Sequence, residues 1–142
     1  MATRTAMAQW NGGLMDGNGT MRMTSGAYEG PYSFKSRFEQ GDGTNPEELI
    51  AAAHAGCFSM AFSAGLGKAG FSPVSVKTTA KVHLEKQDAG FSITKIELIT
   101  EAKVPSIDNA KFQELANSAK SGCPVSRALG AVPEITLNAK LV

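Results

Sequence analysis

The sequence predicts an α+β protein in which a largely antiparallel sheet packs on a long buried central helix. Two long runs of alternating apolar and polar residues, 73–86 and 91–104, are joined by the turn Gln-Asp-Ala-Gly, which is typical of an antiparallel hairpin. A third run, from Pro46 to about Gly65 or Lys68, is apolar on most sides and therefore indicates a buried helix. Strands, a helix, a hairpin, helices and a final strand follow in that order, which favours the α+β class.

The first part of the chain predicts two strands, at residues 3–10 and 20–25, joined by a glycine- and asparagine-rich loop. Residues 26–32 indicate a turn, after which Phe34 and Phe38 are expected to face one side. Thr44 or Asn45 is expected to cap the long helix, because both side chains can accept hydrogen bonds from backbone N–H groups.

The second part of the chain carries clear signals for helix ends. Asp108 is expected to cap a helix that Gly122 closes, and Pro124 is expected to open a short helix ending near Gly130. Residues 134–142 predict the last strand. The apolar stripe of the helix that Asp108 caps consists of Phe112, Leu115, Ala116 and Ala119.

Length and composition predict one domain over residues 1–142. The 142 residues are 42% hydrophobic, enough for one well-buried core, and carry a formal net charge of +1. No basic run favours a nucleic acid or an anionic membrane as partner, and no signal peptide is recognisable at the start. A cytoplasmic location is therefore expected, where two cysteines are thiols or a cycling redox pair rather than a permanent disulfide.

Cys123 stands directly before Pro124, at or next to the N-cap of the short helix. Free N–H groups and the helix dipole stabilise an anion there, and the pKa of a cysteine thiol falls accordingly. The alternative interpretation is a small capping or packing residue, since free cysteines are commonly buried and inert.

Cys57 lies inside the long apolar helix, at helical spacing from Ala53, Met60 and Ala64. Apolar surroundings raise the pKa of a thiol and make it react poorly. On its own, Cys57 is therefore a core residue, and it can act as a nucleophile only if a cationic group comes near it.

The histidines and cysteines allow several other interpretations. His54, Cys57, His83 and Cys123 could supply four zinc ligands, but the paired spacings of zinc sites are absent. The cysteines are too far apart for a thioredoxin-like motif, and no local motif supports a Cys-His hydrolase. His54 is expected to be a helix-surface or core residue, and His83 an ordinary strand residue.

Two segments together resemble the OsmC/Ohr family, the osmotically inducible and organic hydroperoxide resistance peroxidases. They are GTNPEELIAAAHAGCFSMA, residues 43–61, and AKSGCPVSRAL, residues 119–129. The similarity extends to the Arg-Phe-Glu of residues 37–39 and to residues 88–98.

The resemblance implies a cysteine peroxidase for organic and, less directly, inorganic hydroperoxides that needs no metal, haem or flavin. It implies that Cys57 attacks the peroxide, that Cys123 resolves the sulfenic acid as a disulfide, and that a thiol or dithiol regenerates the pair. A lipoylated protein is one candidate reductant. The resemblance also implies a catalytic glutamate, Glu47, and a catalytic arginine.

Arg37 is the expected arginine. In the Ohr branch it lies in the early glycine-rich segment, whereas residues 11–19 here contain none, and Arg37 therefore points to the OsmC branch. A straight helix separates Glu47 from Cys57 by ~15 Å. Glu47 must then act through the long side chain of Arg37, or the site must draw residues from two chains, as the intertwined homodimer implied by the family would allow.

Two other functions remain open from the sequence. A different thiol enzyme, such as a hydrolase or disulfide reductase, could use the same cysteine pair. A non-enzymatic redox sensor or stress-response binding protein could use its disulfide to switch a partner, although no charged tail suggests a partner-binding surface.

Overall fold

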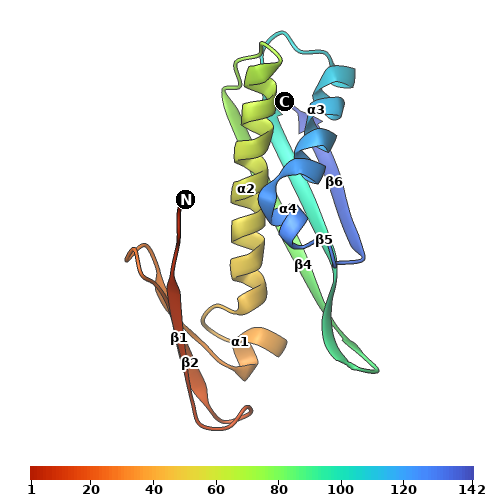
Figure 1. The fold of residues 1–142 in the computed structure, drawn as a ribbon. Helices are drawn as coiled ribbons and strands as arrows, with labels where there is room; N and C mark the ends of the chain where they lie inside the picture. Colours follow the sequence, from red (N-terminus) through yellow and green to blue (C-terminus); the bar gives the residue numbers. More distant parts are fainter. The chain divides into compact units, whose positions relative to one another are not determined.

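The computed structural model describes residues 1–142, which form two compact units, residues 1–49 and 50–142 (Figure 1). Each unit carries its own three-stranded sheet, so the single sheet expected from the sequence is corrected to two. The mixed α+β class is confirmed. The expectation of one domain over residues 1–142 stays a prediction.

The first unit contains an antiparallel sheet in the order β1-β2-β3, formed by β1 (Ala6–Asn11), β2 (Asn18–Met23) and β3 (Glu29–Tyr32). The first two strands confirm the prediction, but β3 lies where a turn was expected. Gly30 and Pro31 misled the prediction, because both residues are typical of turns. Pro31 fits here since β3 is an edge strand, where a missing N–H costs no ladder bond.

α1 (Phe34–Phe38) is one short helical turn closed by a capping box. The Ser36 N–H donates to Ser33 Oγ at 3.1 Å, and the Ser33 N–H donates to Ser36 Oγ at 2.8 Å. The rings of Phe34 and Phe38 lie on one side, 4.9 Å apart. A spacing of four residues places two side chains on one face of either a helix or a strand, so the spacing alone could not identify the helix.

α2 (Pro46–Lys68) confirms the predicted long helix. Asn45 is its cap, because Asn45 Oδ1 accepts the Glu48 N–H at 2.8 Å. The Asn45 side-chain amide also donates to the Ser36 carbonyl at 2.9 Å and so ties the end of α1 to the start of α2.

The prediction that α2 is buried on most sides is wrong for the single chain. One row at four-residue spacing is fully buried, whereas Met60 on another face is 77% exposed and most small residues beside it are exposed. By length and composition α2 could also cross a membrane, a property that core helices share. The buried row consists of His54, Phe58, Phe62 and Leu66.

The second unit contains β4 (Ser75–Gln87), β5 (Gly90–Lys103) and β6 (Glu134–Leu141). β4 and β5 form the predicted antiparallel hairpin, and β6 joins the other edge of β5 in parallel. Gly90 has a φ of 118°, a conformation that glycine adopts without steric cost after a tight turn.

The core of the second unit lies between this sheet and its helices, α2, α3 (Asn109–Gly122) and α4 (Pro124–Ala128) (Figure 1). Asp108 caps α3 as predicted, accepting the Lys111 N–H at 2.9 Å. The rings of Phe62 and Phe112 meet edge to face at 5.2 Å, which joins α2 to α3. The predicted α3 stripe is confirmed, with three members buried and Leu115 packed against the core.

Candidate functional site

Arg37 and Glu47 form a bidentate ion pair within the first unit. Arg37 Nη2 donates to Glu47 Oε1 at 2.8 Å, and Arg37 Nε lies 3.3 Å from both carboxylate oxygens. α1 positions the arginine and the first turn of α2 positions the glutamate. Glu47 is 8% exposed, whereas the Arg37 side chain is 37% exposed. The carboxylate therefore fixes one edge of a guanidinium that still reaches solvent.

A pocket of about 440 Å³ opens beside this guanidinium, also within the first unit. Its wall is largely aromatic, and the Arg37 guanidinium carbon lies 5.2 Å from the ring centre of Phe38. The pocket therefore combines an apolar wall with one cationic group. Its main side chains are Trp10, Leu14, Tyr32, Phe34, Arg37 and Phe38.

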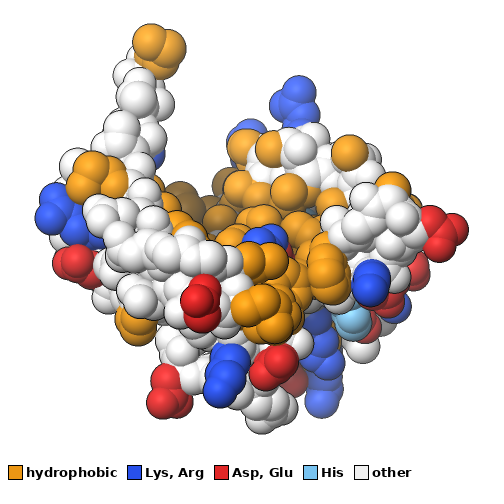
Figure 2. Space-filling view, turned by 90° about the horizontal axis from the view of Figure 1, so that it is seen from below, with side chains coloured by type: hydrophobic (Ala, Val, Ile, Leu, Met, Phe, Trp, Pro, Cys, Tyr) orange, Lys and Arg blue, Asp and Glu red, His pale blue; other side chains and the backbone are white.

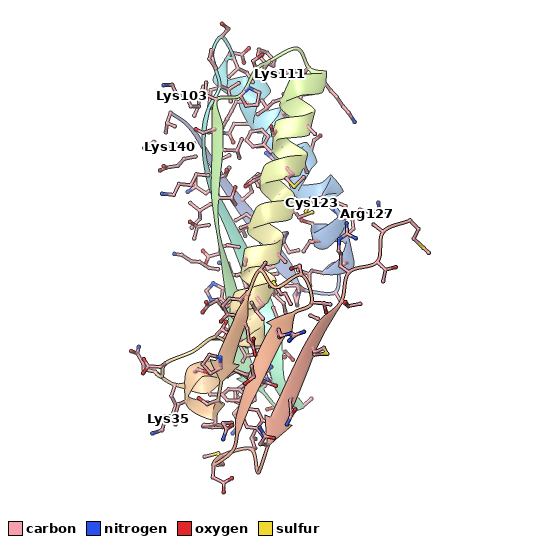
Figure 3. All side chains as sticks on the ribbon, turned by 90° about the vertical axis from the view of Figure 1, so that its left-hand side faces the viewer. Lys35, Lys103, Lys111, Cys123, Arg127 and Lys140 are labelled. Carbon is pink, nitrogen blue, oxygen red and sulfur yellow. The ribbon has the colours of Figure 1, made fainter.

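Cys123 occupies the N-cap of α4, as the sequence predicts. The Ser126 N–H donates to Cys123 Sγ at 3.4 Å, and the Cys123 side chain is fully buried, beside α2 (Figure 3). Burial acts to raise the pKa of the Cys123 thiol. Hydrogen bonds with the Ser126 side chain and backbone, and with Cys57 and the Val125 backbone, outweigh burial and lower that pKa.

Cys57 is partly exposed on α2, and its thiol interacts with that of Cys123. Both cysteines are free thiols. Burial raises the pKa of Cys57, and the neighbouring Cys123 raises it further, while a hydrogen bond from the Val125 backbone lowers it. Cys57 therefore gains no net activation within the second unit, in line with its apolar helix position.

His54 is fully buried on α2, one turn before Phe58. Its Nε2 lies 2.7 Å from Ser126 Oγ, and Ser126 Oγ lies 3.5 Å from Cys123 Sγ. The structure thus places His54 as a core residue in hydrogen-bond contact with α4. Sequence reasoning missed Ser126, although its position three residues after an N-cap cysteine could have identified it as the capping partner.

His83 lies on β4 and pairs with Glu97 of β5. The strand assignment for His83 is therefore confirmed, and this histidine is engaged with a carboxylate rather than with the cysteines. A hydrogen bond from His83 is the main reason that the pKa of the Glu97 carboxyl falls.

Comparison with known proteins gives three consistent results. A profile for OsmC-like proteins matches residues 39–138. Peroxiredoxin OsmC of Escherichia coli is 53% identical over 139 residues, 97% of this chain and 96% of that protein. The organic hydroperoxide resistance protein of Xanthomonas axonopodis pv. citri is 37% identical over 98 residues, 68% of this chain and 67% of that protein.

The fold comparison agrees. The crystal structure of an organic hydroperoxide resistance protein OsmC from Legionella pneumophila matches with a TM-score of 0.71 and 25% identity, covering 99% of both chains. That of an organic hydroperoxide resistance protein from Elizabethkingia anophelis matches with a TM-score of 0.73, also at 25% identity and 99% of both chains.

Proposed function

This chain belongs to the OsmC family, and on that premise we propose that it is a thiol-dependent peroxidase that reduces organic hydroperoxides. The names of its relatives, a peroxiredoxin and organic hydroperoxide resistance proteins, support this reaction class. Hydrogen peroxide is a further substrate in this proposal. Two-electron reduction of the O–O bond gives an alcohol from an organic hydroperoxide and water from hydrogen peroxide.

The proposed reaction has three steps. The Cys57 thiolate attacks one peroxide oxygen, the O–O bond breaks, and Cys57 becomes a sulfenic acid. The leaving alkoxide takes up the proton that the Cys57 thiol released on ionising, and it departs as the alcohol. The Cys123 sulfur then attacks the Cys57 sulfur, forming a disulfide and releasing water. A thiol or dithiol reduces the disulfide and is itself oxidised.

The observation that carries this proposal is the contact between two free thiols from distant parts of the chain. α2 supplies Cys57 and the start of α4 supplies Cys123. Two free thiols held close to one another are suited to reversible disulfide formation between them, which supports the proposed mechanism.

Arg37 is proposed as the group that activates Cys57. Burial raises the pKa of the Cys57 thiol within its own unit, so a positive charge is needed to favour the thiolate. Arg37 supplies such a charge, and Glu47 orients its planar donors. The aromatic pocket beside Arg37 is suited to the apolar tail of an organic hydroperoxide.

A homodimer is proposed as the working form. Met60 and the small residues near it leave one face of α2 uncovered in the single chain, although this face is apolar. Apolar side chains also gather on the surface seen from below (Figure 2). A second copy would bury such surface, as obligate dimers commonly do.

The test compares cumene hydroperoxide, tert-butyl hydroperoxide and hydrogen peroxide, each with excess dithiothreitol. Cys57→Ser should abolish peroxide consumption, because a serine hydroxyl is not ionised near neutral pH. Ser59→Ala, two positions further along α2, is the matched control and should consume peroxide normally. Retention of activity in Cys57→Ser within about tenfold of wild type would rule out the proposed nucleophile.

A further inference from the structure

A buried chain of hydrogen-bonding groups leads from α2 to the second cysteine. His54 Nε2 lies 2.7 Å from Ser126 Oγ, which lies 3.5 Å from Cys123 Sγ. His54 and Cys123 are fully buried and Ser126 is 7% exposed. The peroxidase reaction as stated above uses neither His54 nor Ser126.

We propose that His54 and Ser126 form a proton relay that takes the proton from Cys123 when the Cys57–Cys123 disulfide forms. This inference rests on the peroxidase function proposed above. It names the group that accepts the Cys123 proton in the step that forms the disulfide. His54 acts through Ser126 and is therefore a positioning residue with respect to the reacting sulfur atoms.

The position of His54 in the core indicates that its imidazole does more than fill space. The three other members of its buried row are Phe58, Phe62 and Leu66, so an apolar side chain would suit the position. Instead the row contains an imidazole whose Nδ1 is buried without a hydrogen-bond partner. Burying a polar atom without a partner is destabilising, because the atom loses its hydrogen bonds to water. The contact of Nε2 with Ser126 is the interaction for which the imidazole is needed.

The protonation state of His54 suits an acceptor. Burial is what lowers the pKa of the imidazole, so His54 is neutral at neutral pH and one ring nitrogen has a free lone pair. With the ring proton on Nδ1, Nε2 can accept the Ser126 hydroxyl proton. The titratable groups joined to it through this chain are Cys123 and, next to that thiol, Cys57.

The proton balance of the step is complete. As the Cys123 sulfur attacks the Cys57 sulfenic acid, its proton passes to Ser126 Oγ and the serine proton passes to His54 Nε2. The S–O bond breaks and hydroxide leaves. The proton held on Nε2 returns through Ser126 to this hydroxide, which becomes water, and the imidazole is neutral again. The net products are one disulfide and one water.

Two substitutions interrupt the relay at different points. Ser126→Ala removes its middle, while His54→Gln keeps a polar side chain that cannot take up a proton at neutral pH. With the relay interrupted, the Cys123 proton must leave a fully buried site without a base to accept it. Each variant should therefore form the disulfide on the order of tenfold more slowly at neutral pH.

The first experiment separates the two oxidation steps. Reduced full-length protein is mixed with one equivalent of cumene hydroperoxide, and rapid quenching with mass spectrometry follows first the sulfenic acid and then the disulfide. In wild type, disulfide formation should slow only at acidic pH, where His54 becomes protonated. In both variants it should rise steadily with pH through the neutral range, because Cys123 must ionise unaided.

Sulfenic acid formation is the internal control, since it should proceed at a wild-type rate in both variants and shows that they are folded. Ser59→Ala removes another hydroxyl hydrogen bond of the same unit, to Thr78 Oγ1 at 2.8 Å, and should leave both steps unchanged. Disulfide formation in His54→Gln with wild-type rate and pH profile would overturn the relay.

A second measurement does not depend on peroxide chemistry. In a Cys57→Ser background, thiolate absorbance reports the ionisation of the buried Cys123. The ring nitrogen resonances of His54, one of only two histidines, should shift at the same pH midpoint. If the His54 resonances do not shift when Cys123 ionises, the relay is refuted. If wild-type protein forms no sulfenic acid, the peroxidase function is refuted, and this titration still tests the relay independently.

Discussion

Removal of the Arg37 guanidinium tests both the local structure and the proposed activation of Cys57. In the first unit, Arg37→Ala leaves a Glu47 carboxylate that is only 8% exposed without its ion-pair partner. Two unit charges about 4 Å apart interact by about 4 kcal/mol at an effective dielectric constant of 20. Because the Arg37 side chain is 37% exposed, solvent screening reduces the net effect, and we expect a loss of about 1–2 kcal/mol in stability.

Glu47→Gln should cost less stability, because the more exposed guanidinium can regain water as its partner. The same comparison orders the activities. Arg37→Lys keeps a charge but loses the planar fork, so peroxidase rates should fall in the order wild type, Glu47→Gln, Arg37→Lys and Arg37→Ala.

The assay pairs these rates with the pH dependence of Cys57 alkylation, measured in a Cys123→Ser background. Burial already raises the pKa of Cys57, so loss of a nearby cation must move the alkylation midpoint to higher pH. Urea unfolding of each variant separates loss of stability from loss of activation. An unchanged midpoint in Arg37→Ala would refute the role of Arg37. The next candidates would be two other arginines, Arg22 in β2 and Arg127 in the last turn of α4.

Four further outcomes are expected. Cys123→Ser should reduce one equivalent of peroxide and leave a Cys57 sulfenic acid that dimedone labels, whereas dimedone labelling of Cys123 in Cys57→Ser would reverse the roles. If each active site draws on two chains, Arg37→Ala and Cys57→Ser chains that are mixed equally and refolded together should recover about a quarter of wild-type activity. Half of the dimers then contain one chain of each kind, and each mixed dimer has one intact site. No recovery would place each site within one chain. Phe62→Ala should lower the free energy of unfolding by about 3–5 kcal/mol, as urea titration would show, because this ring is fully buried between Phe58 and Phe112. Burial lowers the pKa of His54 below 6.5, so the unfolded chain binds a proton at this histidine more strongly than the folded chain does. The stability that neutral His54 contributes is therefore lost as the pH falls below 6.5. His54→Gln should make the urea midpoint depend less on pH in this acidic range.

Features that depend on residues close together in the chain could be predicted before the structure was known. Asp108 caps α3, and Asn45, one of the two residues expected as the cap, caps α2. The turn before Gly90 closes the long hairpin, and Cys123 stands at an N-cap. Each of these features can be recognised from a few consecutive residues, because caps and tight turns form between groups that are close together in the chain. The family followed from the two cysteine motifs.

Features that depend on partners distant in the chain could be found only in the folded molecule. Glycine and proline suggested a turn where β3 pairs with β2, and the apolar composition of α2 did not reveal that one row alone is buried in a single chain. The contact of His54 with Ser126 was hidden most completely, because the two residues meet only when α4 packs against α2. Burial and hydrogen bonding between distant segments are set by packing in space, and the local pattern of a sequence does not record which polar group faces which.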